Sequence, residues 1–328
     1  MEKTAKKTDQ KPLGVFDVLS GGFELIWLNP WILLIPIALD LFLWLGPQLN
    51  AQPIFQQMIT VLALSVPANA PAETTQNIEL LQKILQTASE SVNVLGVLAA
   101  GMPSVIGLQP PAAENARAQF VIGDPFALSG VVIVLGFGAA LMTSGYLEMT
   151  ARPVRNETDA RTFVARWLRS CVDLILLAIL IVVGLSVLMI PVTLIAGIFS
   201  LASQGLGSFL MLGGMMLMFW AMLYLVFAVP AIFVSRANAP QALLNSVSIF
   251  RFDFWSAIGL VFIVYLVRAG FGIVWQFFDT NTWGVVFDVI ANAFLSSALI
   301  AAEMIFYNNR MYWLTVAREK KSAVGSRQ

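Results

Sequence analysis

Long apolar stretches recur along the chain and predict membrane-spanning helices. A bilayer core of about 30 Å requires about 20 consecutive apolar residues per helix. Six stretches meet this requirement: residues 23–47, 126–149, 172–198, 209–234, 255–278 and 284–307. The pattern therefore predicts an all-α, polytopic integral membrane protein with six transmembrane helices.

The first two predicted spans are separated by residues 48–125, a connection far longer than two adjacent helices need. Within it, apolar residues recur at steps of three and four over residues 75–97, which is the spacing of one helix face. We expect an amphipathic helix there, and we assign the shorter apolar run 54–66 to the same helical cap. Such a cap can pack on the ends of the spans, lie on the membrane or pair with another subunit.

The distribution of Lys and Arg predicts the orientation of the spans, because these residues are retained on the cytoplasmic side during insertion. They gather in the N-terminal segment, in the connections between spans two and three and between spans four and five, and in the tail. The alternate connections hold only Lys83 and Arg117. Both termini are therefore expected in the cytoplasm, and the cap outside.

The predicted organisation follows from spans and orientation together. A cytoplasmic N-terminal segment with an interfacial helix (1–22) precedes the first transmembrane helix (23–47). An extracytoplasmic helical cap (48–125), the five-helix remainder of the bundle (126–307) and a cytoplasmic tail (308–328) complete the chain.

Short amphipathic segments rich in aromatic and basic residues precede the three spans that start on the cytoplasmic side. Tryptophan rings favour the membrane boundary, and guanidinium groups favour the phosphates of lipid head groups. Contacts with anionic head groups, each contributing about 1 kcal/mol, are expected from Arg152, Arg155, Arg166, Arg169 and Arg251. Acidic residues at the same depth predict interfacial ion pairs: Glu24, Glu148 and Asp173 with Arg152, Arg169 and Arg310.

Composition narrows the chemistry that the chain can perform. Apolar residues make up 58% and charged residues 12%, whereas a soluble domain carries about a quarter charged residues. Nineteen basic and nineteen acidic residues cancel, which gives no reason to expect nucleic acid. Histidine is absent, and the single Cys171 excludes an intramolecular disulfide. We expect no metal and no cofactor, and a lipid-modifying enzyme would depend on Glu148, Asp173 and Glu303 alone.

Three charged residues lie inside predicted spans, where an isolated charge costs about 2.5–3.5 kcal/mol. At about 1.5 Å per residue, Asp40, Arg268 and Asp288 all lie at one level in the outer half of the bundle. We predict that Arg268 forms an ion pair with Asp288, Asp40 or both. Pro36 lies inside the first span, one turn from Asp40, and is expected to kink that helix.

A polar stripe follows one side of the sixth span. Asn292, Ser296 and Glu303 continue from Asp288 within an arc of about 80° at 100° per residue. One interpretation is a permeation or proton path with Asp288 and Arg268 as an outer gate and Glu303 as an inner one. The other is that interhelical hydrogen bonds fix helix register.

Three segments resemble a broad prokaryotic family that includes the membrane domain fused to some glycerophosphodiester phosphodiesterases. They are GFELIWLNPWILLIP (22–36), SGYLEMTARPVRNETDARTFVARWLRS (144–170) and VPAIFVSRANAPQALLNSVSIFRFDFWSAIGLVF (229–262). Asn29-Pro30, Pro230, Ala242 and Ser246 carry the resemblance, whereas the loop 49–124 departs from it. It implies a six-helix bundle in a prokaryotic inner membrane. The catalytic domain has no counterpart in the sequence, so its activity is not implied.

The sequence thus favours a non-enzymatic integral membrane protein that acts in membrane organisation or as the partner of another membrane subunit. The expected partners are the bilayer and anionic lipid head groups. The alternative is a transporter or channel that uses the intramembrane charges and the polar stripe.

Overall fold

The computed structural model describes residues 12–65, 72–105, 118–157, 161–275 and 282–325. Within these ranges the chain forms eleven α-helices, two 3₁₀-helices and one two-stranded sheet. Five helical stretches among the described residues are long and apolar enough to cross a membrane, and a sixth is obtained if one bent helix pair counts as a span. The fold is therefore essentially all-α, as the apolar pattern predicts.

The chain divides into two compact units. Unit 1 comprises Met1–Pro30, Leu147–Gly272 and Ser296–Gln328, and unit 2 comprises Trp31–Tyr146 and Ile273–Leu295. Three helices have residues in both units: α5 (Pro125–Val154), α10 (Phe254–Trp275) and α11 (Thr282–Gly325).

The first predicted span, 23–47, is not one straight helix. Its residues belong to α1 (Val15–Leu28), the 3₁₀-helix η1 (Pro30–Leu33) and α2 (Leu34–Leu45), with a bend of 87° at the break. Pro30 explains the position of the break, because a proline pushes the preceding residue, here Asn29, out of the helical conformation. The prediction of a kink at Pro36 was wrong: this residue lies in the first turn of α2, where no intrahelical N–H bond is lost.

Unit 2 holds the described part of the predicted cap. β1 (Gln48–Asn50) pairs in parallel with β2 (Gln119–Val121), and α3 (Gln52–Leu64) packs beside α4 (Ala72–Ser91). The 3₁₀-helix η2 (Val94–Ala99) follows α4. The helix expected over 75–97 therefore ends at Ser91, and η2 begins two residues later, at Val94.

A small apolar core joins the strands of unit 2 to the start of α5. Ala51, Ile54 and Val94 are buried in it, and Leu128, Val131 and Leu135 of α5 pack against it with other half-buried apolar residues. Asn93 connects the parts, because its side-chain oxygen accepts hydrogen bonds from the N–H groups of Leu49 and Leu95 at 3.0 and 3.1 Å. This amide ties β1 to the first turn of η2.

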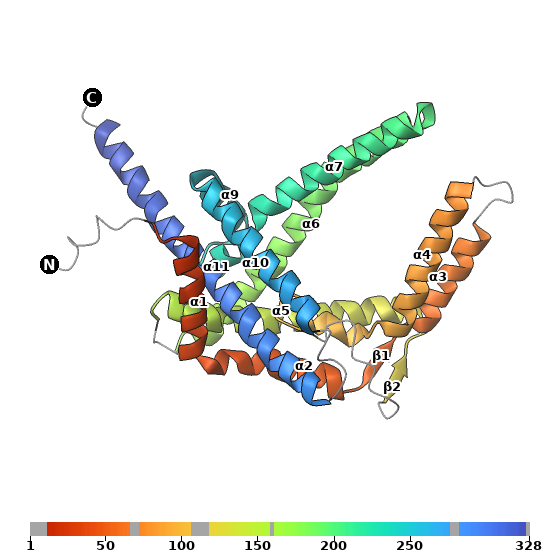
Figure 1. The fold of residues 1–328 in the computed structure, drawn as a ribbon, viewed down its shortest axis with the longest axis horizontal. Coiled ribbons are helices and arrows are strands. Elements are labelled where there is room, and N and C mark those ends of the chain that lie inside the picture. The colour runs from red at the N-terminus through yellow and green to blue at the C-terminus, as the bar shows by residue number, and fades with distance from the viewer. Residues whose placement is uncertain (1–11, 66–71, 106–117, 158–160, 276–281, 326–328) are drawn as a thin grey trace. The chain divides into compact units, whose positions relative to one another are not determined.

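Unit 1 contains a long helical hairpin formed by α6 (Phe163–Ala202) and α7 (Gln204–Leu225) (Figure 1). Glycine permits the close packing: a Cβ on Gly207 would lie 2.6 Å from the Ser200 Cβ, and a Cβ on Gly214 would collide with the Val192 side chain. The short amphipathic segment that precedes the third predicted span is part of α6 from Phe163 onward rather than a separate helix.

The fourth predicted span, 209–234, is interrupted between α7 and α8 (Ala228–Ser235). Pro230 explains the interruption, because it has no N–H to donate to the carbonyl four residues earlier. Buried Ser246 of α9 (Ala239–Phe252) stabilises the break: its hydroxyl donates to the Tyr224 carbonyl at 2.6 Å and accepts from the Phe227 N–H at 3.1 Å. Two backbone groups beside the break are thus satisfied inside the core.

α11 is the most buried of the candidate spans among the described residues. In its apolar 18-residue stretch 61% of the residues are buried, compared with 6–39% in the other four spans. Within unit 1, α1 crosses it closely at Gly22, where a Cβ would lie 2.8 Å from the Ala302 backbone nitrogen. Phe306 of α11 stacks on Phe227 with ring centroids 5.3 Å apart. α11 therefore forms the centre of the core of unit 1.

Candidate functional site

The three charges predicted inside the membrane are distributed over the two units. Asp40 and Asp288 are buried residues of unit 2, and Arg268 is an exposed residue of unit 1 on α10. Within unit 2, the Asp40 carboxylate accepts hydrogen bonds from the Ser104 hydroxyl and from the Val105 N–H at 3.1 Å. Asp40 therefore anchors the segment after η2. The predicted ion pair of Arg268 with either aspartate would join the two units and stays a prediction.

The polar stripe lies on α11 as expected from its spacing. Ser296 is buried, whereas Asn292 and Glu303 are half-buried. Within unit 1, Arg268 lies close enough to Glu303 for its charge to act on this carboxylate. Glu303 is thus an acidic neighbour of Arg268 that the predicted pairing did not include. The two interpretations of the stripe, path or helix register, stay predictions.

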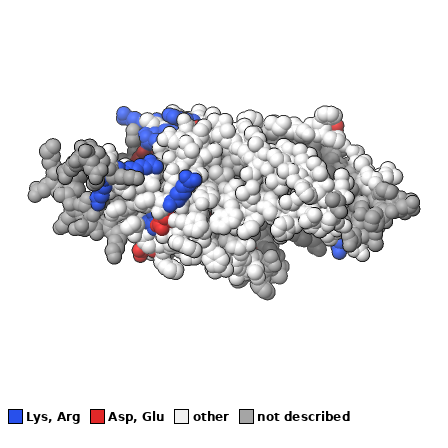
Figure 2. Space-filling model, turned by 90° about the horizontal axis from the view of Figure 1, so that it is seen from above, with Lys and Arg blue, Asp and Glu red and all other residues white. Residues whose placement is uncertain are grey.

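Charged side chains of unit 1 gather where α5 and α8 end and where α6 begins. Figure 2 shows one face of the molecule, on which most coloured side chains lie in one region beside a broad uncharged surface. Five charged residues that ion pairs join form what we call the arginine cluster: Glu148, Arg155, Glu157, Arg166 and Arg236. All five belong to unit 1.

Two carboxylates bind the three arginines of the cluster. Arg155 Nη2 lies 2.5 Å from Glu148 Oε1 and 3.1 Å from Glu157 Oε2, and its Nη1 donates to the Phe233 carbonyl. Glu157 also binds Arg166 at 2.6 Å through Oε2 and Arg236 through Oε1. The side chains of Arg155 and Glu148 are only 8% and 3% exposed. This pair is nearly buried, so each of its charges depends on its partner, whereas Glu157, Arg166 and Arg236 are 23%, 27% and 49% exposed.

Backbone geometry at two helix ends positions the cluster. After α5, Asn156 adopts φ 56°, and the Glu157 N–H bonds to the Arg152 carbonyl at 3.1 Å. The Asn156 N–H bonds to the Pro153 carbonyl at 3.1 Å, which completes a Schellman motif. Arg236 ends α8 in the same left-handed region, with φ 54°. These turns bring Glu157 and Arg236 together.

The surroundings of Glu157 stabilise its charged form. Burial alone would raise the pKa of this carboxyl, but the charge and hydrogen bond of Arg155 and the charges of Arg236 and Arg166 outweigh burial. The pKa of Glu157 is therefore lowered from its ordinary value of 4.5. Glu157 stays ionised at neutral pH and connects the three arginines.

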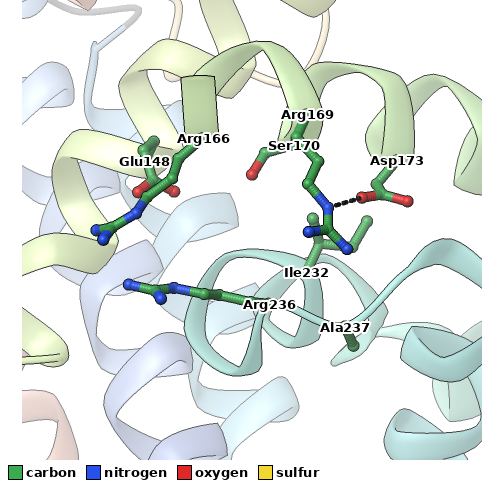
Figure 3. Close-up of a pocket in the computed structure, with 8 residues that line it drawn as sticks. All are labelled: Glu148, Arg166, Arg169, Ser170, Asp173, Ile232, Arg236 and Ala237. Carbon is green, nitrogen blue, oxygen red and sulfur yellow. Dashed lines mark ion pairs between the residues drawn. The ribbon is translucent and has the colours of Figure 1, made fainter. Parts of the chain in front are cut away.

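A pocket of about 200 Å³ opens beside the cluster (Figure 3). It is lined by Glu148, Arg166, Arg169, Ser170, Asp173, Ile232, Arg236 and Ala237. In Figure 3, Arg166 and Arg236 extend on one side of the pocket, and Arg169 lies on the other with Asp173, 3.9 Å from it. At about 30 Å³ per water molecule, the pocket has room for a small polar group.

The arginines expected at lipid head groups have different environments. Arg155 is committed to the cluster, whereas Arg166 is 27% and Arg169 is 75% exposed. The Arg152 guanidinium carbon lies 5.6 Å from the ring centroid of Phe163. Arg251 is exposed on α9. The predicted head-group contacts stay predictions.

Arg310 forms a second ionic centre in unit 1. Its Nε lies 2.7 Å from Asp253 Oδ2, and its Nη2 donates to the Leu13 carbonyl at 3.0 Å. Its guanidinium carbon lies 4.5 Å from the Phe306 ring centroid. The partner of Arg310 is thus Asp253, which the expected interfacial pairs did not include. This centre ties the segment before α1 to α10 and α11.

The comparisons with known proteins do not identify a family for this chain. No family model, curated protein or solved structure matches it. Among the described residues, no group of three or more His, Cys, Asp or Glu is placed to hold a metal ion.

Two members of the cluster, Glu157 and Arg236, were not among the predicted site residues. A signal for both is present in the sequence. Glu157 lies among the arginines of one connection, and Arg236 is the first charged residue after the uncharged stretch 174–235. The pairing itself depends on the left-handed turn at Asn156, which hydropathy does not indicate.

Proposed function

We propose that the chain is a non-enzymatic integral membrane protein that organises the membrane around it or supports another membrane subunit. One observation carries this proposal: only 6% of the apolar stretch of α6 is buried within the protein, and the arginine cluster lies where this helix begins. A helix that is apolar on all sides is stable where it is buried, in the core of a large protein or in a membrane. Because the rest of this chain leaves α6 uncovered, we assign its apolar surface to lipid or to another membrane subunit.

The arginine cluster supports a structural role. Arg155 forms ion pairs with Glu148 and Glu157. Glu157 also pairs with Arg166 of α6 and with Arg236 at the end of α8. Glu157 is a weak general base in this network, because its lowered pKa gives the carboxylate little affinity for a proton at neutral pH. The network holds helix ends in place and leaves the hairpin surface for contacts with lipid or a partner.

The orientation belongs to the same proposal. Both termini and the arginine cluster are assigned to the cytoplasmic side of a prokaryotic inner membrane, because Lys and Arg gather in these segments. The resemblance to the membrane domain of some glycerophosphodiester phosphodiesterases agrees with this assignment.

Transport is the second candidate, and one observation favours it. Asp288 is completely buried inside an apolar helix, a position where ionisable residues often serve ion or proton pathways. An ion or proton that moves along this helix would have to pass the polar residues Asn292 and Ser296.

Proteoliposomes separate the two candidates. The full chain and the double variant Arg268→Gln/Asp288→Asn are reconstituted, and proton and ion flux are measured against empty vesicles. The proposal predicts no flux above empty vesicles for either protein and an unchanged mass of the vesicle lipids. Flux by the wild type that the double variant abolishes would refute it in favour of transport, and a changed lipid mass would refute it in favour of an enzyme.

A further inference from the structure

We propose that the pocket beside the arginine cluster binds a phosphate group, supplied by the head group of an anionic phospholipid. The residues that carry this site are Arg169, Ser170 and Arg236. The choice of a lipid as the source of the phosphate rests on the membrane location proposed above. The match between the pocket and a phosphate group rests on the side chains of the pocket alone.

The position of the pocket points to head-group depth. Residues 174–235 contain no Asp, Glu, Lys or Arg, and this stretch starts and ends at pocket residues: Asp173 precedes it and Arg236 follows it. Both ends of this uncharged helical stretch therefore lie at the pocket. In a bilayer, such a boundary between charged and uncharged chain lies where the lipid phosphates are.

Among the described residues that line the pocket, the charges leave one cation in excess. Three arginines, Arg166, Arg169 and Arg236, face two carboxylates, Glu148 and Asp173. A phosphodiester carries a single negative charge and would balance this excess.

The donors that remain available face the same space. Arg169 is 75% exposed and lies 3.9 Å from Asp173, longer than a strong charge-assisted hydrogen bond. Arg236 is 49% exposed and binds Glu157 through Nη2. Ser170 lines the pocket, and in Figure 3 its hydroxyl points toward the space between Arg166 and Arg169.

The type of donor favours phosphate. Guanidinium groups present planar pairs of N–H donors that match the oxygens of a phosphate, and a hydroxyl adds a further donor. Glu148 stands in the lining but is neutralised by Arg155 at 2.5 Å. An anionic head group would draw Arg169 away from its weak contact with Asp173 and leave the arginine cluster intact.

The test measures lipid binding to the full chain in detergent by native mass spectrometry. Phosphatidylglycerol and phosphatidylethanolamine are titrated against the wild type, Arg169→Gln, Ser170→Ala and Arg318→Gln. The last variant is the matched control, because it removes an exposed arginine that neither lines the pocket nor is among the arginines expected at lipid head groups. Protection of Cys171 from thiol reagents shows that each variant is folded.

We expect wild-type protein to prefer phosphatidylglycerol, Arg169→Gln to weaken its binding about five- to tenfold, and Ser170→Ala about two- to threefold. Arg318→Gln should change it less than twofold. Equal binding of both lipids, or equal losses in Arg169→Gln and Arg318→Gln, would overturn the proposal.

A second arm identifies the source of the phosphate. Inorganic phosphate is titrated by isothermal calorimetry into the same proteins without added lipid. Phosphate binding that depends on Arg169 and is not displaced by phosphatidylglycerol would overturn the lipid source and leave a site for soluble phosphate. The flux experiment is independent, so the proposed function can fail while the pocket stands, and the reverse.

Discussion

Replacing Arg155 with methionine removes the central charge of the arginine cluster and keeps a side chain of similar length. Arg155 is 8% exposed and is bonded to Glu148, Glu157 and the Phe233 carbonyl. Its loss leaves the Glu148 carboxylate, which is 3% exposed, without the cation bonded to it. Removing one partner of a buried ion pair costs about 3–5 kcal/mol. We expect Arg155→Met to destabilise unit 1 by this amount.

Cys171 offers a direct assay for this change. It is the single cysteine of the chain, 5% exposed, and it lies in α6 beside the pocket residue Ser170. A thiol reagent therefore labels the protein only when this region opens. At about 1.4 kcal/mol per tenfold change, a loss of 3 kcal/mol raises the labelling rate by a factor on the order of 100. Arg251→Met is the control, and it should label at the wild-type rate.

The double variant Glu148→Gln/Arg155→Met completes the reasoning. Removing both members of a buried pair leaves no uncompensated charge, so much of the stability should return. We expect the double variant to label more slowly than Arg155→Met alone. An increase below about fivefold in Arg155→Met, or a double variant that labels faster than either single variant, would refute the claim that these charges depend on each other.

Three further predictions concern other parts of the chain. Gly22→Ala should destabilise the protein by about 1–3 kcal/mol, because its Cβ would collide with the Ala298 carbonyl in a tightly packed crossing. Gly21→Ala places its Cβ at an ordinary contact distance of 3.4 Å and should stabilise α1 by up to about 1 kcal/mol; detergent unfolding curves that give both variants equal stability would contradict this. The contribution of Glu157 is complete above its ordinary pKa of 4.5 and is lost as the pH falls through its lowered folded-state pKa, so Cys171 labelling should rise in acid, and Glu157→Gln should remove that rise. Asp40→Asn should speed hydrogen exchange in the segment after η2, because one acceptor oxygen becomes a donor; unchanged exchange would show that Asp40 does not anchor this segment.

Hydropathy predicted the apolar helices well because a bilayer requires long apolar runs regardless of tertiary contacts. It could not predict where the helices end. α11 continues to Gly325 although its apolar part ends near residue 307, because the residues that follow, such as Arg318, Glu319 and Lys320, are good helix formers. The break after α1 had a local signal in Asn29-Pro30, whereas Pro36 drew attention to the wrong place.

Long-range pairing explains most of what the sequence did not reveal. β1 and β2 have three residues each, which is too short for the alternating pattern that indicates a strand. They also lie far apart in the chain, so their pairing has no local signal. The arginine-rich connections predicted an ionic region, but the choice of partners depended on the turn at Asn156. That turn directs Glu157 toward Arg166 and Arg236, which come from α6 and from the end of α8.

The central claim is that the arginine cluster lies at the cytoplasmic face and that the α6–α7 hairpin crosses the membrane from it. Single cysteines test this on a Cys171→Ser background, one at Thr162 before α6 and one at Ser203 between α6 and α7, both exposed in the structure. A membrane-impermeant maleimide is applied to right-side-out and inverted membrane vesicles. We predict that Ser203→Cys is labelled only in right-side-out vesicles and Thr162→Cys only in inverted ones. Labelling of both positions from the same side would contradict the claim.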